Sequence, residues 1–364
     1  MSERRIIMRD QSVSIVKGIA IAIVVMIHSI PPGFIAGFFG MFAVSSFFFM
    51  SGYCFKDNYL DDAYKFLKKR LTGIYWPYLK WSLLFLLLHN MFYHLNIYSD
   101  EYGYEGKTSV LYTSSDFVRK AISITTQMQG HEQLLGAYWF MKLLFVGSFI
   151  FYIALKVLKS KAWGALLLLA LSVLLSTLDW KLYYFNIGTR EFYAAFFIYV
   201  GYLYKKHQLD LHQRPWIWCL GVIMLVVGTQ LWFTTMHDYD YWKILPHAFT
   251  VISATLTLLC FSQYLARKVE NKSVKCMVFI GDHTMEVLTW HFLSMKLVSL
   301  MLIAIYHLPI KRLSEFPVIE EYARQGWWIA YFIVGIGIPV VWTYYYHLLK
   351  DRLTKCSSDK TLTR

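Results

Sequence analysis

The 364-residue sequence has few charged residues and few cysteines. Only 16% of its residues are charged, whereas about 25% is usual for a soluble domain. This low charge, combined with 57% hydrophobic residues, excludes an intrinsically disordered chain, and 20 glycines are too few for collagen. The five cysteines are odd in number and lack CxxC or Cys/His spacing. The sequence therefore predicts neither a disulfide framework nor a metal site.

Acidic residues are also scarce, since 23 of them face 36 lysines and arginines, which leaves a net charge of +13. In a soluble protein such a charge would make nucleic acid the first partner to consider. The mean hydropathy is +0.41, however, and the apolar runs approach the length that crosses a bilayer. We therefore expect the basic residues to orient membrane helices, with the lipid bilayer as a partner and no nucleic acid.

A transmembrane helix needs about 20 mostly apolar residues to cross the hydrocarbon core. By this criterion the sequence predicts an all-α, polytopic membrane protein with about ten transmembrane helices. The expected spans are residues 12–30, 34–55, 74–94, 137–157, 162–178, 190–205, 216–234, 244–266, 277–305 and 327–349. The first run is not followed by a small-residue cleavage site, which predicts an uncleaved first helix.

The positions of the basic residues predict the orientation of these spans. If the N-terminus is cytoplasmic, the inner segments hold 24 lysines and arginines and the outer segments hold nine. This asymmetry predicts that both termini are cytoplasmic. We expect a single membrane-embedded domain over residues 1–350, with an extracytoplasmic loop at about 95–136 and a cytoplasmic tail at 351–364.

The first expected span contains two ionisable residues, which are costly inside a membrane. Lys17 lies near its inner end and His28 near its outer end, eleven residues later. This spacing is about three helical turns, so both side chains project from one face, roughly 16 Å apart along the axis. In one interpretation they serve chemistry at the two ends of the helix. In the other, Lys17 anchors the topology and His28 is a structural hydrogen-bonding residue.

Several sequence blocks occur in an order that resembles the acyltransferase-3 family of membrane acyltransferases, which includes bacterial sugar O-acetylases. The blocks are KGIAIAIVVMIHS, FFFMSGYCF, FLKKRLTGIYWPY, AYWFMKLLF, REFYAAFFIYVGYLYKKH and IGDHTMEVLTWHFL. The resemblance implies a ten-helix protein that transfers an acyl group from a cytoplasmic donor, usually acetyl-CoA, to a sugar hydroxyl at or beyond the outer face. It also implies a catalytic role for His28 and a donor-binding role for Lys17.

The family's second basic motif, Arg-x-x-Arg before the third span, is matched only in part. Arg70 occupies its first position, but Gly73 occupies the second. Lys68 and Lys69 offer charge nearby, so Lys17, Lys69 and Arg70 are the candidate residues for binding the phosphates of acyl-CoA. The alternative is that the two lysines only set topology.

His28 can act in two ways. As a general base, its imidazole would take the proton of the acceptor hydroxyl and later protonate the leaving thiolate. As a nucleophile, it would carry the acyl group transiently. The sequence leaves both mechanisms open.

Five further residues are candidates for orienting His28 or for binding the acceptor. Three are ionisable groups in expected spans, and two are aromatic residues near the outer end of the fourth span: Glu191, Glu286, His291, Tyr138 and Trp139. Alternatively, each ionisable group only makes a buried hydrogen bond that stabilises the fold. The aromatic pair could stack on a sugar ring or simply anchor the helix at the membrane interface.

These observations predict an integral-membrane O-acyltransferase of the bacterial cytoplasmic (inner) membrane. Its expected partners are an acyl-CoA, with acetyl-CoA as co-substrate and no bound cofactor, and a hydroxyl of a sugar in a surface glycan or its precursor. The alternatives are a transporter or flippase for a glycan or small solute and a non-catalytic membrane component of a glycan-assembly machine.

Overall fold

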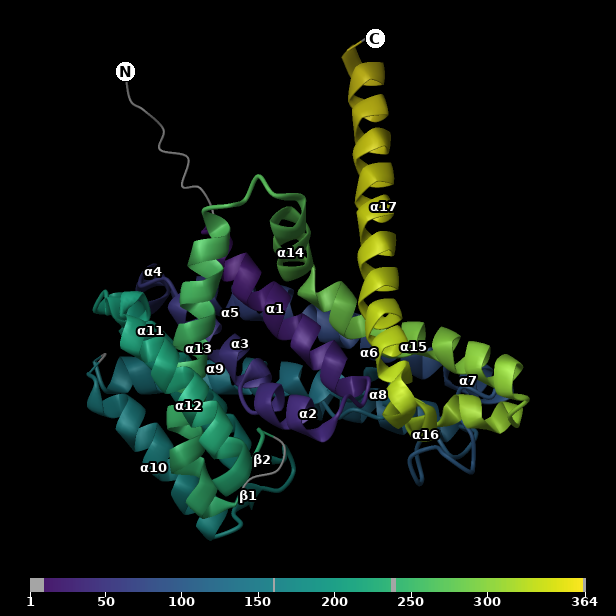
Figure 1. Cartoon of the computed structure of the whole chain (residues 1–364), viewed down its shortest axis with the longest axis horizontal. Coiled ribbons are helices and arrows are strands. Elements are labelled where there is room, and N and C mark those ends of the chain that lie inside the picture. The colour runs from purple at the N-terminus through teal and green to yellow at the C-terminus, as the bar shows by residue number, and fades with distance from the viewer. Residues whose placement is uncertain (1–9, 160, 237–239, 363–364) are drawn as a thin grey trace. The chain divides into compact units, whose positions relative to one another are not determined.

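The computed structural model describes residues 10–159, 161–236 and 240–362, and it confirms that the protein is all-helical. The only strands in these ranges are β1 (Lys181–Leu182) and β2 (Ile187–Gly188), which form one antiparallel pair with Lys181 opposite Gly188. The chain forms two compact units (Figure 1). The first unit contains residues up to 24, 33–79 and 139–282, and the second contains 25–32, 80–138 and 283 onward.

The first unit is built mainly from apolar helices joined by short turns. Helix α1 (Gln11–His28) begins in this unit and ends in the other, and the start of α6 (Trp76–Leu87) also belongs here. The remaining elements are α2 (Gly33–Gly40), α3 (Ala43–Tyr53), α4 (Asn58–Asp61), α5 (Ala63–Arg70), the π-helical turn η1 (Leu71–Tyr75), α9 (Trp139–Val157), α10 (Trp163–Thr177), α11 (Thr189–Lys206), the 3-10 turns η3 (Asp210–Gln213) and η4 (Tyr241–Lys243), α12 (Pro215–Leu231), α13 (Ile244–Ala266) and α14 (Lys272–Asp282).

Helix α11 packs against α3, α9 and α10, and α12 packs against α13 (Figure 1). The crossing of α3 and α11 requires glycine on both sides. A Cβ atom on Gly52 would collide with the carbonyl oxygen of Ile198, and one on Gly201 would collide with that of Phe49. The two backbones are therefore in direct contact, as small residues permit in membrane helices.

The second unit contains the end of α1, the rest of α6 and the following elements: α7 (His89–His94), α8 (Ser114–Gln127), the 3-10 turns η2 (Gln133–Tyr138) and η5 (Ile310–Ser314), α15 (Thr284–Tyr306), α16 (Glu320–Tyr322), the π-helical turn η6 (Ala323–Trp327) and α17 (Trp328–Leu362). Helices α15 and α17 pack against each other. Gly335 on α17 approaches both Met295 of α15 and Val25 of α1, so these three helices meet closely. The amphipathic helix α8 begins with a capping box formed by Thr113 and Asp116.

Each of the ten expected spans is occupied by helix, but the number that cross a membrane remains a prediction. Six segments are long and apolar enough: Gln11–His28, Gly33–Tyr53, Gln133–Val157, Tyr241–Ala266, Thr284–Tyr306 and Glu320–Lys350. Two more, α10 and α12, are apolar but shorter. Helix α11 has the length but carries charged residues at both ends, and the expected span 74–94 is interrupted between α6 and α7. These six segments make the chain a multi-pass membrane protein.

Besides 74–94, two further expected spans differ from a single continuous helix. The span 34–55 is divided between α2 and α3, and the span 277–305 is divided at His283 between α14 and α15. At the other extreme, α17 continues for 35 residues, roughly 50 Å at the rise of an α-helix. This length exceeds the hydrocarbon core of about 30 Å, so the helix extends into the segment expected to form the tail.

The close crossing of α3 and α11 leads to a stability prediction. Gly201→Ala should destabilise the protein by about 1–3 kcal/mol, because the added methyl group forces two packed backbones apart. The matched control is Gly337→Ala on α17, where a Cβ atom would meet no other atom within 4 Å. Thermal unfolding in detergent measures both variants. Equal melting temperatures for the two variants would contradict the close crossing.

Candidate functional site

His28 is the last residue of α1, and the chain turns sharply after it. The Ser29 hydroxyl donates to the carbonyl of Val25 at 2.9 Å, and Ile30 adopts a positive φ of 58°. Pro31 and Pro32 follow and prevent the helix from continuing. The helix end therefore holds the His28 imidazole in a half-buried position within the second unit.

The His28 imidazole is hydrogen-bonded to a second histidine, His291 of α15, in the same unit. The Nδ1 atom of His28 lies 3.0 Å from Nε2 of His291. The two rings are nearly parallel, with centroids 5.1 Å apart. His291 is completely buried. The structure thus brings together two residues that the sequence separates by more than 260 positions.

The backbone of α15 determines which nitrogen carries the proton in each ring. Nδ1 of His291 lies 2.9 Å from the carbonyl oxygen of Leu288 and 3.1 Å from that of Val287. A carbonyl oxygen only accepts hydrogen bonds, so this nitrogen must be protonated. In neutral His291 the Nε2 atom is then an acceptor, and Nδ1 of His28 must be the donor. The remaining nitrogen of His28, Nε2, therefore carries a lone pair in the neutral ring.

This Nε2 atom has no hydrogen-bond partner among the described residues. A lone pair that is held in one orientation can accept a proton or attack an electrophilic carbon. Protonation at Nε2 makes His28 an imidazolium, which its Nδ1–H bond to His291 stabilises. His291 thus orients the ring as a carboxylate does in a catalytic triad, without its negative charge.

Phe292 packs beside both imidazoles. Its ring centroid lies 4.7 Å from that of His28 and 3.9 Å from that of His291. Its side chain is almost completely buried. Packing on this side limits the rotation of both histidines.

Two other predicted residues lie on or against α15. The Tyr138 hydroxyl is 2.6 Å from Oγ1 of Thr289, and Tyr138 is buried with 1% exposure. Tyr138 therefore anchors α15 two residues before His291. Glu286 is half-buried and precedes His291 by five residues, a rotation of about 140° around the helix. It therefore lies on a different face of α15 from His291.

The remaining acceptor candidates belong to the first unit. Glu191 is buried, and its Oε2 atom accepts a 2.7 Å hydrogen bond from the backbone N–H of Gly188 at the start of α11. This contact caps the helix. Trp139 is half-buried at the start of α9. Their contribution to the binding of an acceptor remains a prediction.

A second polar group in the first unit surrounds the C-terminal end of α3. The Arg70 Nη1 atom is 3.4 Å from the hydroxyl of Ser51, and its Nε atom is buried without a hydrogen-bond partner. The guanidinium packs over the Phe66 ring at 5.2 Å, and burial lowers the Arg70 pKa to about 10. Among the described residues no carboxylate forms an ion pair with Arg70. A buried cation without an acid is a candidate receptor for an anion.

Lys205 of α11 approaches the same end of α3. Its Nζ atom is 3.4 Å from the hydroxyl of Tyr53 and 4.7 Å from the centre of that ring. We call Arg70, Ser51, Tyr53 and Lys205 the basic cluster. Lys69 is exposed on the same helix as Arg70, and Lys17 is half-buried on α1.

Ser51 and Lys205 were not predicted from the sequence as site residues. Both lie within blocks that carried the family resemblance, FFFMSGYCF and YLYKKH. A serine and a lysine are too common in such positions to indicate a site by themselves. Only the contact between α3 and α11 places them at one location.

Within the described ranges there is no group of three or more histidine, cysteine or acidic side chains that could hold a metal ion. The His28–His291 pair offers at most two nitrogen ligands, and one of them already accepts a hydrogen bond.

Comparison with known proteins gives one match. A protein-family model described as an acyltransferase domain, that of the Acyl_transf_3 family, matches residues 10–347. No curated protein and no solved structure matches the chain. The match covers nearly the entire chain, including His28, His291 and the basic cluster.

The hydrogen-bond geometry predicts the tautomer of both histidines. In protein labelled with ¹⁵N-histidine, His28 and His291 should both give the chemical shifts of the neutral Nδ1–H form. His291→Leu should release His28 from this form, because no acceptor remains for its Nδ1–H. His291→Gln, whose amide oxygen can replace the accepting nitrogen, is the matched control. Signals of an Nε2–H tautomer at His28 in the unmodified protein would contradict the derived order of donors.

Proposed function

Because the chain belongs to the acyltransferase-3 family of membrane acyltransferases, we propose that it transfers an acyl group between a cytoplasmic thioester and an outer hydroxyl. The donor is an acyl-CoA, most simply acetyl-CoA, and the acceptor is a sugar in a surface glycan or its precursor. The enzyme belongs to the bacterial inner membrane. The observation that carries this proposal is the orientation of the His28 ring, whose Nε2 lone pair is left free of protein partners by the bond to His291 among the described residues.

In the general-base mechanism the acceptor hydroxyl lies against Nε2 of His28. As its oxygen attacks the thioester carbonyl, the hydroxyl proton moves to Nε2. The new carbon–oxygen bond forms, the carbon–sulfur bond breaks, and the imidazolium returns the proton to the leaving thiolate. The products are the O-acyl sugar and free CoA. His291 accepts the His28 Nδ1–H bond throughout and so stabilises the transient imidazolium.

The nucleophilic mechanism uses the same nitrogen. Nε2 attacks the thioester carbonyl, the carbon–sulfur bond breaks, and CoA leaves as a thiolate, which gives an acyl-imidazolium that keeps its Nδ1–H bond to His291. The acceptor hydroxyl then attacks the acyl carbon, the carbon–nitrogen bond breaks and restores the Nε2 lone pair, and the hydroxyl proton passes to the thiolate. Both mechanisms require a lone pair on Nε2, so the tautomer set by the Val287 and Leu288 carbonyls serves either one.

The basic cluster supports the donor side of the proposal. Coenzyme A carries several phosphate charges, and Arg70 offers a guanidinium without an acidic partner among the described residues. Lys205 adds a second cation at the same end of α3. Lys69 and Lys17 add charge on α5 and α1. Along the continuous helix α1, Lys17 and His28 are roughly 16 Å apart, on the order of the length of a pantetheine arm.

The proposed role of His28 leads to a prediction about catalysis. In detergent or nanodiscs, the protein should transfer acetyl from acetyl-CoA to a sugar acceptor, and His28→Ala should reduce that rate by at least about 10²- to 10⁴-fold. His94→Ala is the control, because His94 is an exposed histidine of the same unit. Mass spectrometry of the acceptor detects the added acetyl group. Full activity in His28→Ala would eliminate both mechanisms.

The proposed role of Arg70 leads to a prediction about the binding of the acyl donor. Arg70→Met should weaken acetyl-CoA binding by about ten- to a hundredfold, because it removes a charge-assisted hydrogen-bond donor from a largely buried site. Lys65→Met on the same helix is the control, because the Lys65 side chain is exposed. Calorimetry with acetyl-CoA measures both affinities. An unchanged affinity in Arg70→Met would exclude the basic cluster as the donor site.

A further inference from the structure

A series of aromatic rings leads from His28 to the surface of the second unit. Phe292 contacts the His28 ring, as described above. Phe316 lies against Phe292 with centroids 4.6 Å apart, and Tyr104 lies against Phe316 at 5.5 Å in an edge-to-face arrangement. Exposure increases along the series, from 1% for Phe292 through a half-buried Phe316 to 41% for Tyr104. The charge pattern of the sequence predicts that Phe316 and Tyr104 lie in outer segments.

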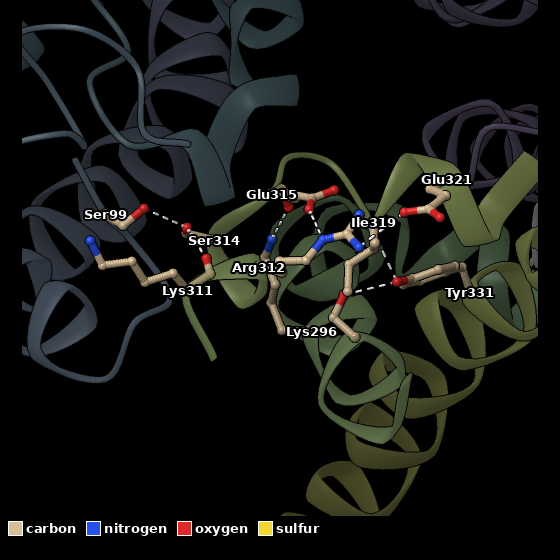
Figure 2. A network of polar contacts seen from close by, with 10 residues as sticks. Ser99, Lys296, Lys311, Arg312, Ser314, Glu315, Ile319, Glu321 and Tyr331 are labelled. Atoms are coloured by element: carbon tan, nitrogen blue, oxygen red, sulfur yellow. Dashed lines mark hydrogen bonds and ion pairs between the residues drawn. The ribbon is translucent and has the colours of Figure 1, made fainter. Parts of the chain in front are cut away.

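The backbone next to Phe316 is held in place by a polar network (Figure 2). Lys296 of α15 donates to the carbonyl oxygen of Glu315 at 2.5 Å, and the Glu315 carboxylate accepts from Arg312. The Ser314 hydroxyl bonds to that of Ser99 at 2.6 Å. Farther along, Tyr331 of α17 accepts from the backbone N–H of Ile319. These bonds anchor the chain on both sides of Phe316.

Gly136 makes room for the Phe316 ring. A Cβ atom at this position would approach the Phe316 Cζ atom to 2.9 Å, closer than carbon atoms normally pack. Gly136 belongs to η2, which packs against α15. The position of Phe316 thus depends on glycine at position 136 as well as on the polar network.

We propose that Phe316 and Tyr104 form the platform that binds the sugar ring of the acceptor. This inference rests on the proposed function. A sugar presents an apolar C–H face that packs on aromatic rings and a rim of hydroxyls that needs polar partners. The exposed carboxylates of Glu101 and Glu105 flank Tyr104 in the sequence and supply acceptors for such hydroxyls.

The arrangement also orients the acceptor relative to the base. Phe292 lies between Phe316 and His28, so a sugar on the platform has only one ring between itself and the imidazole. In the proposed complex the sugar ring lies on the platform one ring away from the imidazole, and the rest of the glycan extends toward Tyr104. By contrast, Tyr138 is 1% exposed and its hydroxyl is bonded to Thr289. In this structure Tyr138 therefore offers no open face for stacking.

The platform is tested by replacing its rings with aliphatic side chains of similar size. Phe316→Leu and Tyr104→Leu should each raise the KM for the sugar acceptor by about 3- to 10-fold, the effect of one aromatic contact. KM for acetyl-CoA and the affinity for CoA should not change. Tyr104→Phe keeps the ring and should behave like the unmodified protein. Gly136→Ala should raise the acceptor KM with both rings still present, because it displaces Phe316.

Tyr102→Leu is the control for the integrity of the loop, since no ring contact joins Tyr102 to the aromatic series within the described residues. A direct binding measurement separates this proposal from the proposed function. Saturation-transfer NMR with methyl α-glucoside, methyl α-galactoside and chitobiose should detect a bound sugar in the unmodified protein and a weaker one in Phe316→Leu. Absence of saturation transfer to all three sugars would overturn the platform.

The two failures give different results. If the protein transfers acetyl groups but Phe316→Leu and Tyr104→Leu leave the acceptor KM unchanged, the platform is wrong and the proposed function stands. If a sugar binds in a Phe316-dependent manner but no acyl transfer occurs, the proposed function is wrong and the platform stands. A loss of acetyl-CoA binding in the two leucine variants would also overturn the platform, because the rings would then support the donor side or the fold.

Discussion

The orientation of His28 depends on the hydrogen bond that His291 makes to its own helix backbone. A protonated Nδ1 shared by the carbonyls of Val287 and Leu288 leaves Nε2 as an acceptor, and this acceptor determines the orientation and tautomer of His28. In water such a preference would be weak, because solvent offers donors and acceptors to every nitrogen. In a buried, apolar site an unpaired polar group costs free energy, so the order of donors and acceptors is maintained.

The cost of an unpaired polar group also distinguishes two half-buried arginines, Arg312 and Arg70, by whether they have an acidic partner. Arg312 is paired with the carboxylates of Glu315 and Glu321, and these hydrogen bonds raise its pKa. It belongs to a satisfied network that holds the Phe316 segment in place. Arg70 has only a long contact to Ser51 and a buried Nε without a partner, and burial lowers its pKa. The first arrangement is complete within the protein, whereas the second favours an anionic ligand.

The proposed function assigns the two substrates to residues of different units. The first unit provides the cations suited to a phosphorylated donor, and the second provides the imidazole and the aromatic rings suited to an acceptor. Helix α1 belongs to both units, with Lys17 in one and His28 in the other.

Much of the fold could be predicted from the sequence. Apolar runs of membrane length predicted helices at all ten positions, because backbone groups in lipid must be satisfied within the helix. The breaks at His283, between α2 and α3, and between α6 and α7 were not predicted, since hydropathy averages over a window and does not register a local change in backbone direction. The number of spans and the orientation of both termini remain predictions from hydropathy and charge.

The sequence by itself determined the helical class, the family and the choice of His28 as the principal candidate, because each depends on local composition or on residues close in the chain. The sequence also indicated His291 and Tyr138 as candidate site residues, but it did not indicate that both are connected to helix α15. Only the tertiary structure decided that His291 is the partner of His28, that Tyr138 is an anchor, and that Lys205 and Ser51 join Arg70. These relations depend on contacts between helices that are distant in the sequence, and glycine-sized gaps such as those at Gly52, Gly201 and Gly136 determine how closely the segments approach.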